Sequence, residues 1–192
     1  MKMPDQLYLF FKKGNSLIKM NRLILLVLVL LASLNIFARE ITNKDIEQIH
    51  KDINNMYTAF ETGDASLLLA SAHSSIYKIT GGKSNYESLV VSSVEEIMEQ
   101  GIIFHEAKLG KPTKLYLSGE EEICFVPRVS IMEYKGQKMK STGFLIAIRS
   151  KGSNDWKYLD GSGLRRDQGL LWKLLPELSK DVELPANFLE KL

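Results

Sequence analysis

The chain has 192 residues, of which 45% are hydrophobic and 25% are charged, and its formal net charge at pH 7 is +2. This composition excludes a disordered or collagen-like polymer, and the length suffices for one ordinary domain with a buried core. Residues 1–38 hold five basic residues and one acidic residue, so the rest of the chain is close to neutral. A near-neutral body lacks the basic footprint of nucleic-acid-binding proteins, and we expect no nucleic-acid partner.

The amino terminus has the features of a secretory signal peptide. Twelve uncharged residues, Leu23–Leu34, follow a basic segment, and the small residue Ala38 precedes a charged pair. This run is shorter than the roughly 20 residues of a membrane-spanning helix. We therefore expect a secreted protein, cleaved after Ala38, in a bacterial periplasm or outside the cell. The alternative is an uncleaved signal, which would be the chain's one membrane contact. Met20 would be a more ordinary start and would make residues 1–19 an upstream extension.

Cysteine and histidine usage limits the chemistry that we expect. The single cysteine, Cys124, excludes an internal disulfide, and its apolar run Ile123–Val126 predicts a buried, unreactive thiol. The three histidines, His50, His73 and His105, lack the spacing of a metal site, so we expect no metal and no other cofactor. The chain contains no N-glycosylation sequon, which favours a bacterial compartment.

A long helix and a short one are predicted directly after the leader. Thr42 and Asp45 form a capping-box pattern, and apolar residues then recur at spacings of three and four up to Gly63. Gly63 is a typical residue after a helix end, and Asp64 can cap the short leucine-rich helix that follows.

The next segment predicts a strand and then a helix. Ser75–Thr80 is a short β-rich run that Gly81 closes. Ser84 and Glu87 form a second capping-box pattern before another apolar helical face, which Gly101 ends.

From residue 102 onward the apolar period changes from helical to two, which predicts a series of strands. The expected strands are residues 102–109, 113–117, 123–134, 138–149 and 155–160. Pro127 cannot donate to a ladder, so the third strand should be bulged or at an edge there. Consecutive strands with short turns indicate an antiparallel sheet that the preceding helices cover on one face. The predicted fold class is a two-layer α+β domain.

The carboxyl-terminal segment is also apolar. Residues 170–175 hold five large apolar residues in six positions, and Pro176 then ends the expected helix. Since such a helix would not stay in water, we expect it to fold back onto the domain or onto a partner chain, which would allow a homodimer. We divide the chain into a leader at 1–38, a domain at 39–163, and a C-terminal helix with an extended tail at 164–192.

Two strings in this order resemble the nuclear transport factor two-like superfamily of cystatin-like and polyketide-cyclase-like folds. They are YTAFETGD at Tyr57–Asp64 and WKYLDG at Trp156–Gly161, and the resemblance covers about residues 40–163. It implies a cone-shaped domain in which a curved, mostly antiparallel sheet wraps the long helix and leaves a pocket at its open end. Members of the superfamily include isomerases, dehydratases, cyclases and binding modules, so the fold does not fix the function.

Four side chains are candidates to line the pocket that the resemblance implies: Tyr57, His73, Tyr77 and Arg128. His73 is also the candidate catalytic base, and the tyrosines could offer phenols. A strand arginine that points into a cavity could hold a ligand carboxylate through two hydrogen bonds. Each residue also has a plain structural interpretation: a capping or surface histidine, a packed tyrosine, or an outward guanidinium.

Three functions remain open at this stage. The sequence lacks a paired acid–base signature, which favours a non-catalytic exported module that binds a small hydrophobic or acidic ligand, or a protein partner. The alternative is a cofactor-independent isomerase, dehydratase or cyclase in which His73 is the base, Asp160 or Glu106 orients it, and Tyr57 or Tyr77 donates to the substrate. A carboxylate that contacts His73 inside a closed pocket would favour the enzyme. The third function is a structural protein that docks a partner through its C-terminal tail.

Overall fold

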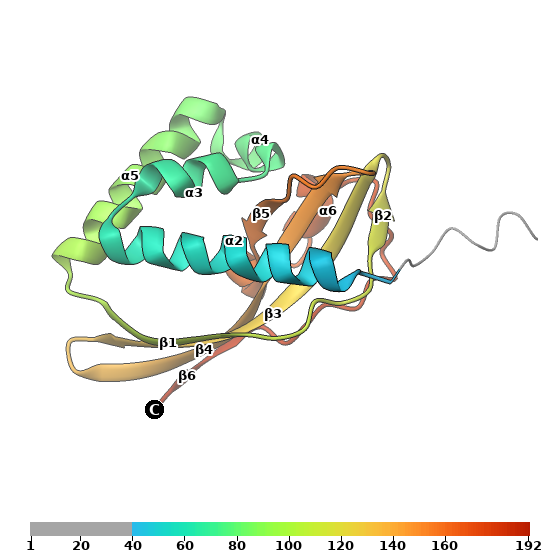
Figure 1. Cartoon of the computed structure of the whole chain (residues 1–192). Coiled ribbons are helices and arrows are strands. Elements are labelled where there is room, and N and C mark those ends of the chain that lie inside the picture. Colours follow the sequence, from blue (N-terminus) through green and yellow to red (C-terminus); the bar gives the residue numbers. More distant parts are fainter. Residues whose placement is uncertain (1–39) are drawn as a thin grey trace, which may run out of the picture. The chain divides into compact units, whose positions relative to one another are not determined.

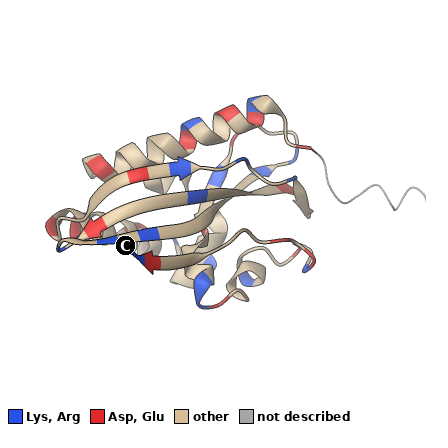
Figure 2. Cartoon of the chain, turned by 90° about the horizontal axis from the view of Figure 1, so that it is seen from below, with Lys and Arg blue, Asp and Glu red and all other residues tan. Residues whose placement is uncertain are grey.

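The computed structural model describes residues 40–192, which belong to one compact unit (Figure 1). The leader predicted at residues 1–38 lies outside the described residues. The fold is α+β, as predicted, with most of the helices preceding an antiparallel sheet. None of the helices in this part of the chain has the length and apolar composition needed to span a membrane. Acidic and basic residues are interspersed along the long helix and the strands in Figure 2.

The first helix, α2 (Asn43–Thr62), begins and ends where the sequence predicts. The Thr42 hydroxyl accepts a hydrogen bond from the Asp45 backbone N–H at 3.2 Å, and the Asp45 carboxylate accepts one from the Thr42 backbone N–H at 3.3 Å. These two bonds satisfy donors that a helix start would otherwise leave unpaired. Gly63 ends the helix in a left-handed conformation with φ of 74°, which glycine adopts without strain.

Four helical segments follow: α3 (Ala65–Ser71), the 3-10 turn η1 (Ser74–Ile76), α4 (Tyr77–Thr80) and α5 (Lys83–Glu99). The strand predicted at Ser75–Thr80 is therefore wrong. His73 caps η1 through a ring nitrogen, and the Thr80 hydroxyl donates back to the Ile76 carbonyl at 3.1 Å. Ile76 packs against the core, so local hydrogen bonds and burial together favour the helical conformation over a strand.

The capping box predicted at Ser84 and Glu87 does not form. Helix α5 starts earlier, because Gly82 takes the N-cap position with φ of 114°, which leaves Ser84 inside the first turn. Glu87 pairs instead with Lys83, at 3.6 Å between the charged atoms. The predicted end of this helix is confirmed, since Gly101 follows its last turn with φ of 63°.

Two long strands form the centre of the sheet. Strands β3 (Glu121–Tyr134) and β4 (Gln137–Ser150) pair along their whole length through a tight turn at Lys135 and Gly136, both with positive φ. The shorter strands flank this hairpin: β1 (Ile103–Leu109) and β2 (Tyr116–Ser118) both pair with β3, and β5 (Lys157–Asp160) and β6 (Phe188–Lys191) both pair with β4. All of these pairings are antiparallel.

Pro127 lies in β3 at a position where its missing N–H breaks no ladder bond. Its carbonyl accepts a hydrogen bond from the Gly110 N–H at 2.7 Å, so this residue's backbone polar groups face the outer edge. There β1 has ended and β2 has not begun. The Thr113 hydroxyl fills the gap by accepting the Phe125 N–H at 3.0 Å. The prediction gave a bulge or an edge position at Pro127, and the structure has the edge position, with no register shift against β4.

The sheet buries apolar residues on both of its faces. On one face, Cys124 and Val126 of β3 pack with residues of α2. On the other face, Phe125 and residues of β4 pack with the C-terminal segment that contains the short helix α6 (Leu170–Leu174). Figures 1 and 2 show α2 and α6 on opposite sides of the sheet. Residues 164–192, which the sequence separates from the domain, therefore contribute to its core.

Candidate functional site

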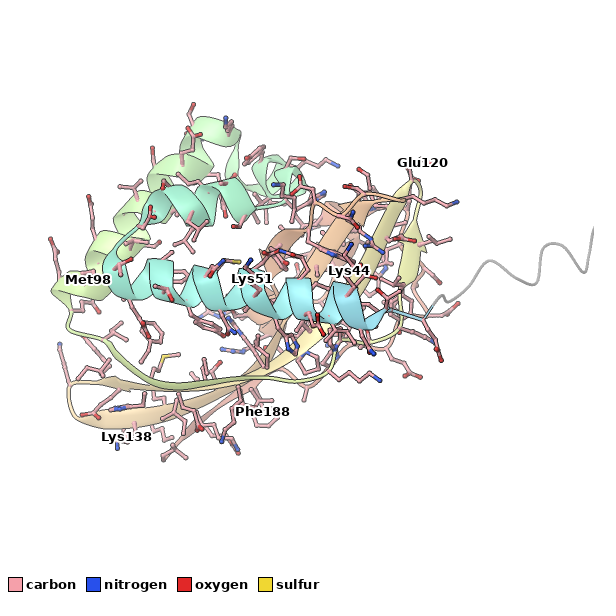
Figure 3. The ribbon with its side chains drawn as sticks, viewed as in Figure 1. Lys44, Lys51, Met98, Glu120, Lys138 and Phe188 are labelled. Atoms are coloured by element: carbon pink, nitrogen blue, oxygen red, sulfur yellow. The ribbon has the colours of Figure 1, made fainter. Side chains whose placement is uncertain are left out.

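One pocket of about 340 Å³ lies between the helices and the sheet. Its walls come from α2, α3, α4, α5 and strands β3, β4 and β5. Lys44 and Lys51 of α2, labelled in Figure 3, are exposed and are not part of this lining. Most of the lining is apolar and includes Ile53, Met56, Phe60, Leu68, Val90 and Leu145. This volume is at the lower end of the range for small-molecule sites.

A largely buried arginine and a half-exposed aspartate form the charged part of this lining. Arg128 comes from β3 and Asp160 from the end of β5, and their side chains are 14% and 51% exposed. The Arg128 Nη2 donates to both carboxylate oxygens of Asp160, at 2.9 Å each. The sequence predicts an arginine that holds a carboxylate, and here the carboxylate belongs to the protein itself.

A glycine in the intervening strand leaves room for this contact. Gly143 of β4 lies directly opposite Arg128, and β5 pairs with the other edge of β4. A Cβ atom at Gly143 would lie 3.8 Å from the Arg128 Nε and 3.5 Å from an Arg165 nitrogen. Any longer side chain would compete with these guanidinium groups for space, so the glycine keeps the path from Arg128 to Asp160 open.

Two buried polar atoms of the lining residues have no hydrogen-bond partner among the described residues: the Tyr57 hydroxyl and the Arg128 Nε. Burial alone lowers the pKa of Arg128, but the Asp160 charge and the Tyr57 hydroxyl outweigh it and raise that pKa above its ordinary value. Each unpartnered buried group costs about 1–3 kcal/mol, and such groups often mark a place where a ligand or water binds.

Tyr86 of α5 faces this charged pair from the helical wall of the pocket. Burial raises the pKa of its hydroxyl, and the neighbouring Tyr77 and the charge of Asp160 raise it further. Tyr77 itself is not a lining residue; its ring packs against that of Tyr86 with centroids 5.6 Å apart. Tyr77 thus supports the pocket wall from behind, and Tyr86 is a lining residue that sequence reasoning missed.

His73 lies outside the pocket lining and is engaged at both ring nitrogens. Its Nδ1 lies 2.9 Å from the Ser75 hydroxyl and also accepts the Ser75 backbone N–H, so Nε2 carries the hydrogen. Nε2 donates to Glu121 at 2.9 Å. The carboxylate that contacts His73 is therefore Glu121; Asp160 binds Arg128, and Glu106 pairs with Lys108. The structure brings Tyr57 and Arg128 together at the pocket but not His73 or Tyr77.

A second buried polar cluster joins the start of α2 to the sheet. The Arg149 Nε donates to Glu122 at 2.8 Å, its Nη1 donates to Asp45, and its guanidinium stacks on the Trp156 ring at 4.3 Å from the centroid. Burial raises the pKa of Asp45, but hydrogen bonds from Thr42 and the charge and hydrogen bonds of Arg149 outweigh it and hold that pKa below its usual value. None of these residues lines the pocket, so the cluster is structural.

Two further observations bear on reactive groups. Within residues 40–192, His, Cys, Asp and Glu side chains form no cluster of three that could hold a metal ion. Cys124 is fully buried, and this burial raises the pKa of its thiol to about 12. Such a thiol stays protonated at neutral pH and is a poor nucleophile.

Comparison of this chain with protein-family models, with curated proteins and with solved structures found no match.

Proposed function

We propose that the protein is an exported, non-catalytic module that binds a small and largely apolar ligand in the pocket between α2, α5 and the sheet. The observation that carries this proposal is an apolar cavity whose lining residues include Tyr57 and Arg128, each of which has a buried donor without a partner among the described residues. Burial of an apolar ligand there would contribute about 25 cal/mol for each Å² removed from water, and a ligand oxygen could satisfy the donors. The leader predicted from the sequence supports export.

Binding is favoured over catalysis by the position of the candidate base. None of the three histidines of the chain lines the pocket, and His73 already uses both ring nitrogens in contacts with Ser75 and Glu121. An isomerase or cyclase mechanism that depends on this base would need it within reach of a bound substrate. The resemblance to the nuclear transport factor two-like superfamily stays a proposal, which a pocket beside the long first helix supports.

Two tryptophan variants on α5 test the proposal. Ser93 and its neighbour Ser92 are both exposed residues of α5, but only Ser93 lines the pocket. We expect the neutral dye N-phenylnaphthylamine to bind the wild-type chain with increased fluorescence. Ser93→Trp should reduce this binding because the indole occupies the pocket, and the matched control Ser92→Trp should leave it unchanged. Equal dye affinity of the wild type and Ser93→Trp would contradict the proposed site.

A further inference from the structure

We propose that Asp160 determines the chemical class of ligand that the pocket accepts. By occupying the Arg128 guanidinium, it makes the pocket select neutral ligands with a hydrogen-bond acceptor, such as a ketone, ester or amide carbonyl, over carboxylic acids. This inference rests on the ligand-binding function proposed above and adds to it the class of ligand and the residue that sets it.

The charges of the pocket lining already balance without a ligand. Arg128 and Asp160 are the two charged residues among the described residues that line it. Both oxygens of Asp160 lie 2.9 Å from the same Arg128 nitrogen, so the aspartate takes the contact that a ligand carboxylate would otherwise make. A carboxylate that entered would have to share the guanidinium with Asp160 and come close to a like charge.

The negative charge of Asp160 also extends to the helical wall of the pocket. It contributes to the raised pKa of the Tyr86 hydroxyl, which lines the pocket from α5. Arg165, a further cation close to Gly143, is not a lining residue, and its guanidinium donates to Asn187 at 2.7 Å and to Ser141 at 2.6 Å. An ionised ligand would therefore lose its hydration in an apolar cavity without gaining an unpaired cation in return.

A neutral carbonyl oxygen fits the donors that remain. The Arg128 Nε–H and the Tyr57 O–H belong to the lining and have no partner among the described residues. A carbonyl oxygen offers two lone pairs, and the hydroxyl hydrogen of Tyr57 can rotate to meet one of them. Such a ligand satisfies both donors without adding a second negative charge beside Asp160.

The test compares two ligands that differ at one atom. Octanoate and methyl heptyl ketone share the same alkyl chain and carbonyl, and the ketone carries a methyl group where octanoate carries the charged oxygen. Their affinities for the full chain are measured by titration calorimetry at neutral pH. We expect the ketone to bind the wild type roughly tenfold or more tightly than octanoate, the difference that one charge-assisted contact produces.

Asp160→Asn is the decisive variant. Asparagine keeps the size of the side chain and can still cap the turn η2 (Gly161–Arg165), where Asp160 accepts the Ser162 N–H. With Arg128 no longer neutralised, octanoate should gain roughly tenfold or more in affinity and become the preferred ligand. The matched control Asp155→Asn changes a carboxylate that lies on the exposed surface and not in the pocket, and it should leave both affinities unchanged.

The outcomes separate this inference from the proposed function. If octanoate binds the wild type as tightly as the ketone, or if Asp160→Asn leaves the order of affinities unchanged, the assignment of Asp160 is overturned while the binding function stands. If neither ligand binds the wild type, the proposed function fails and this inference fails with it. If Asp160→Asn does not fold, the comparison of octanoate with the ketone on the wild type still tests the inference.

Discussion

The buried Arg149 cluster gives the sharpest prediction of stability. We consider the substitution Arg149→Met, which keeps much of the side-chain length and removes the guanidinium. Arg149 is the cation between two carboxylates, Asp45 and Glu122, and all three side chains are about nine-tenths buried or more. The substitution removes the cation that both buried carboxylates contact, and it also removes the stacking on Trp156.

The expected loss in the free energy of unfolding is about 3–5 kcal/mol, the cost of removing one partner from a buried ion pair. Since a typical domain is stable by about 5–15 kcal/mol, this loss should shift the urea midpoint strongly. Lys83→Met is the matched control, because Lys83 forms an exposed pair with Glu87 on α5. That pair should contribute less than about 0.5 kcal/mol.

The pH dependence tests the electrostatic cause. In the wild type the pKa of Asp45 is lowered, so its stabilising contribution is complete above the unfolded value of about 3.9 and is lost as the pH falls through the lower folded pKa. In Arg149→Met, burial without the guanidinium should instead raise the pKa of Asp45. The stability gap between the two proteins should therefore narrow as the pH falls from neutral to about 4.5.

Two results would refute this reasoning. One is a loss below about 1 kcal/mol at neutral pH, and the other is a gap that stays constant on acidification. The triple variant Arg149→Met, Asp45→Asn, Glu122→Gln gives an independent check, because it removes both carboxylate charges together with the cation. It should recover a large part of the stability that the single substitution loses.

Two further predictions concern packing. In the folded protein the Cys124 thiol should not react with a disulfide reagent, because it is buried and its pKa is raised to about 12. It should react once the chain is unfolded in urea, and stoichiometric labelling of the native chain would show this prediction to be incorrect. Gly161→Ala should lower the free energy of unfolding by about 1–3 kcal/mol, since the new methyl group would lie 2.6 Å from the Phe144 carbonyl oxygen. Gly163→Ala, where a Cβ meets open space, is its control in thermal melts, and equal melting temperatures of the two variants would contradict the reasoning.

The local signals in the sequence were reliable where nothing competed with them. The Thr42–Asp45 capping box and the glycine at position 63 define α2 because each depends on neighbours within a few residues. The capping-box pattern at Ser84 and Glu87 failed because Gly82, two residues earlier, could start the same helix in a conformation open to glycine. A local capping pattern predicts where a helix begins or ends only when no neighbouring residue can cap that helix equally well.

The pocket was predictable only in part, since it depends on strand order. Tyr57 and Arg128 could be chosen from their positions on a helix and a strand. The partner of Arg128 could not, because Asp160 reaches it only through the order β3–β4–β5 and the space left by Gly143. Phe60, which lies in the string Tyr57–Asp64, is half-buried and lines the pocket as well.

The burial of the second face of the sheet was also predicted only in part. The run Ile123–Val126 is apolar at every position, which is typical of a strand that is buried on both sides. The predicted helices before the sheet cover only one of its faces, whereas residues 170–175 were expected to fold back onto the domain or a partner chain with no position on the sheet specified. In the structure Leu171 and Leu175 of that segment cover the face that includes Phe125. Together, the apolar strand and the apolar C-terminal segment indicate that this segment packs on the second face of the sheet.

The packing of residues 170–178 on the sheet has a consequence for synthesis of the chain. Phe125 and Phe144 lie on a face that stays uncovered until these later residues have left the ribosome, at about 5–20 residues per second. During that interval the nascent domain exposes aromatic side chains and unpaired strand edges. Chains in this state bind chaperones and aggregate readily. The order of the sequence thus delays completion of the fold until the C-terminal segment has been synthesised.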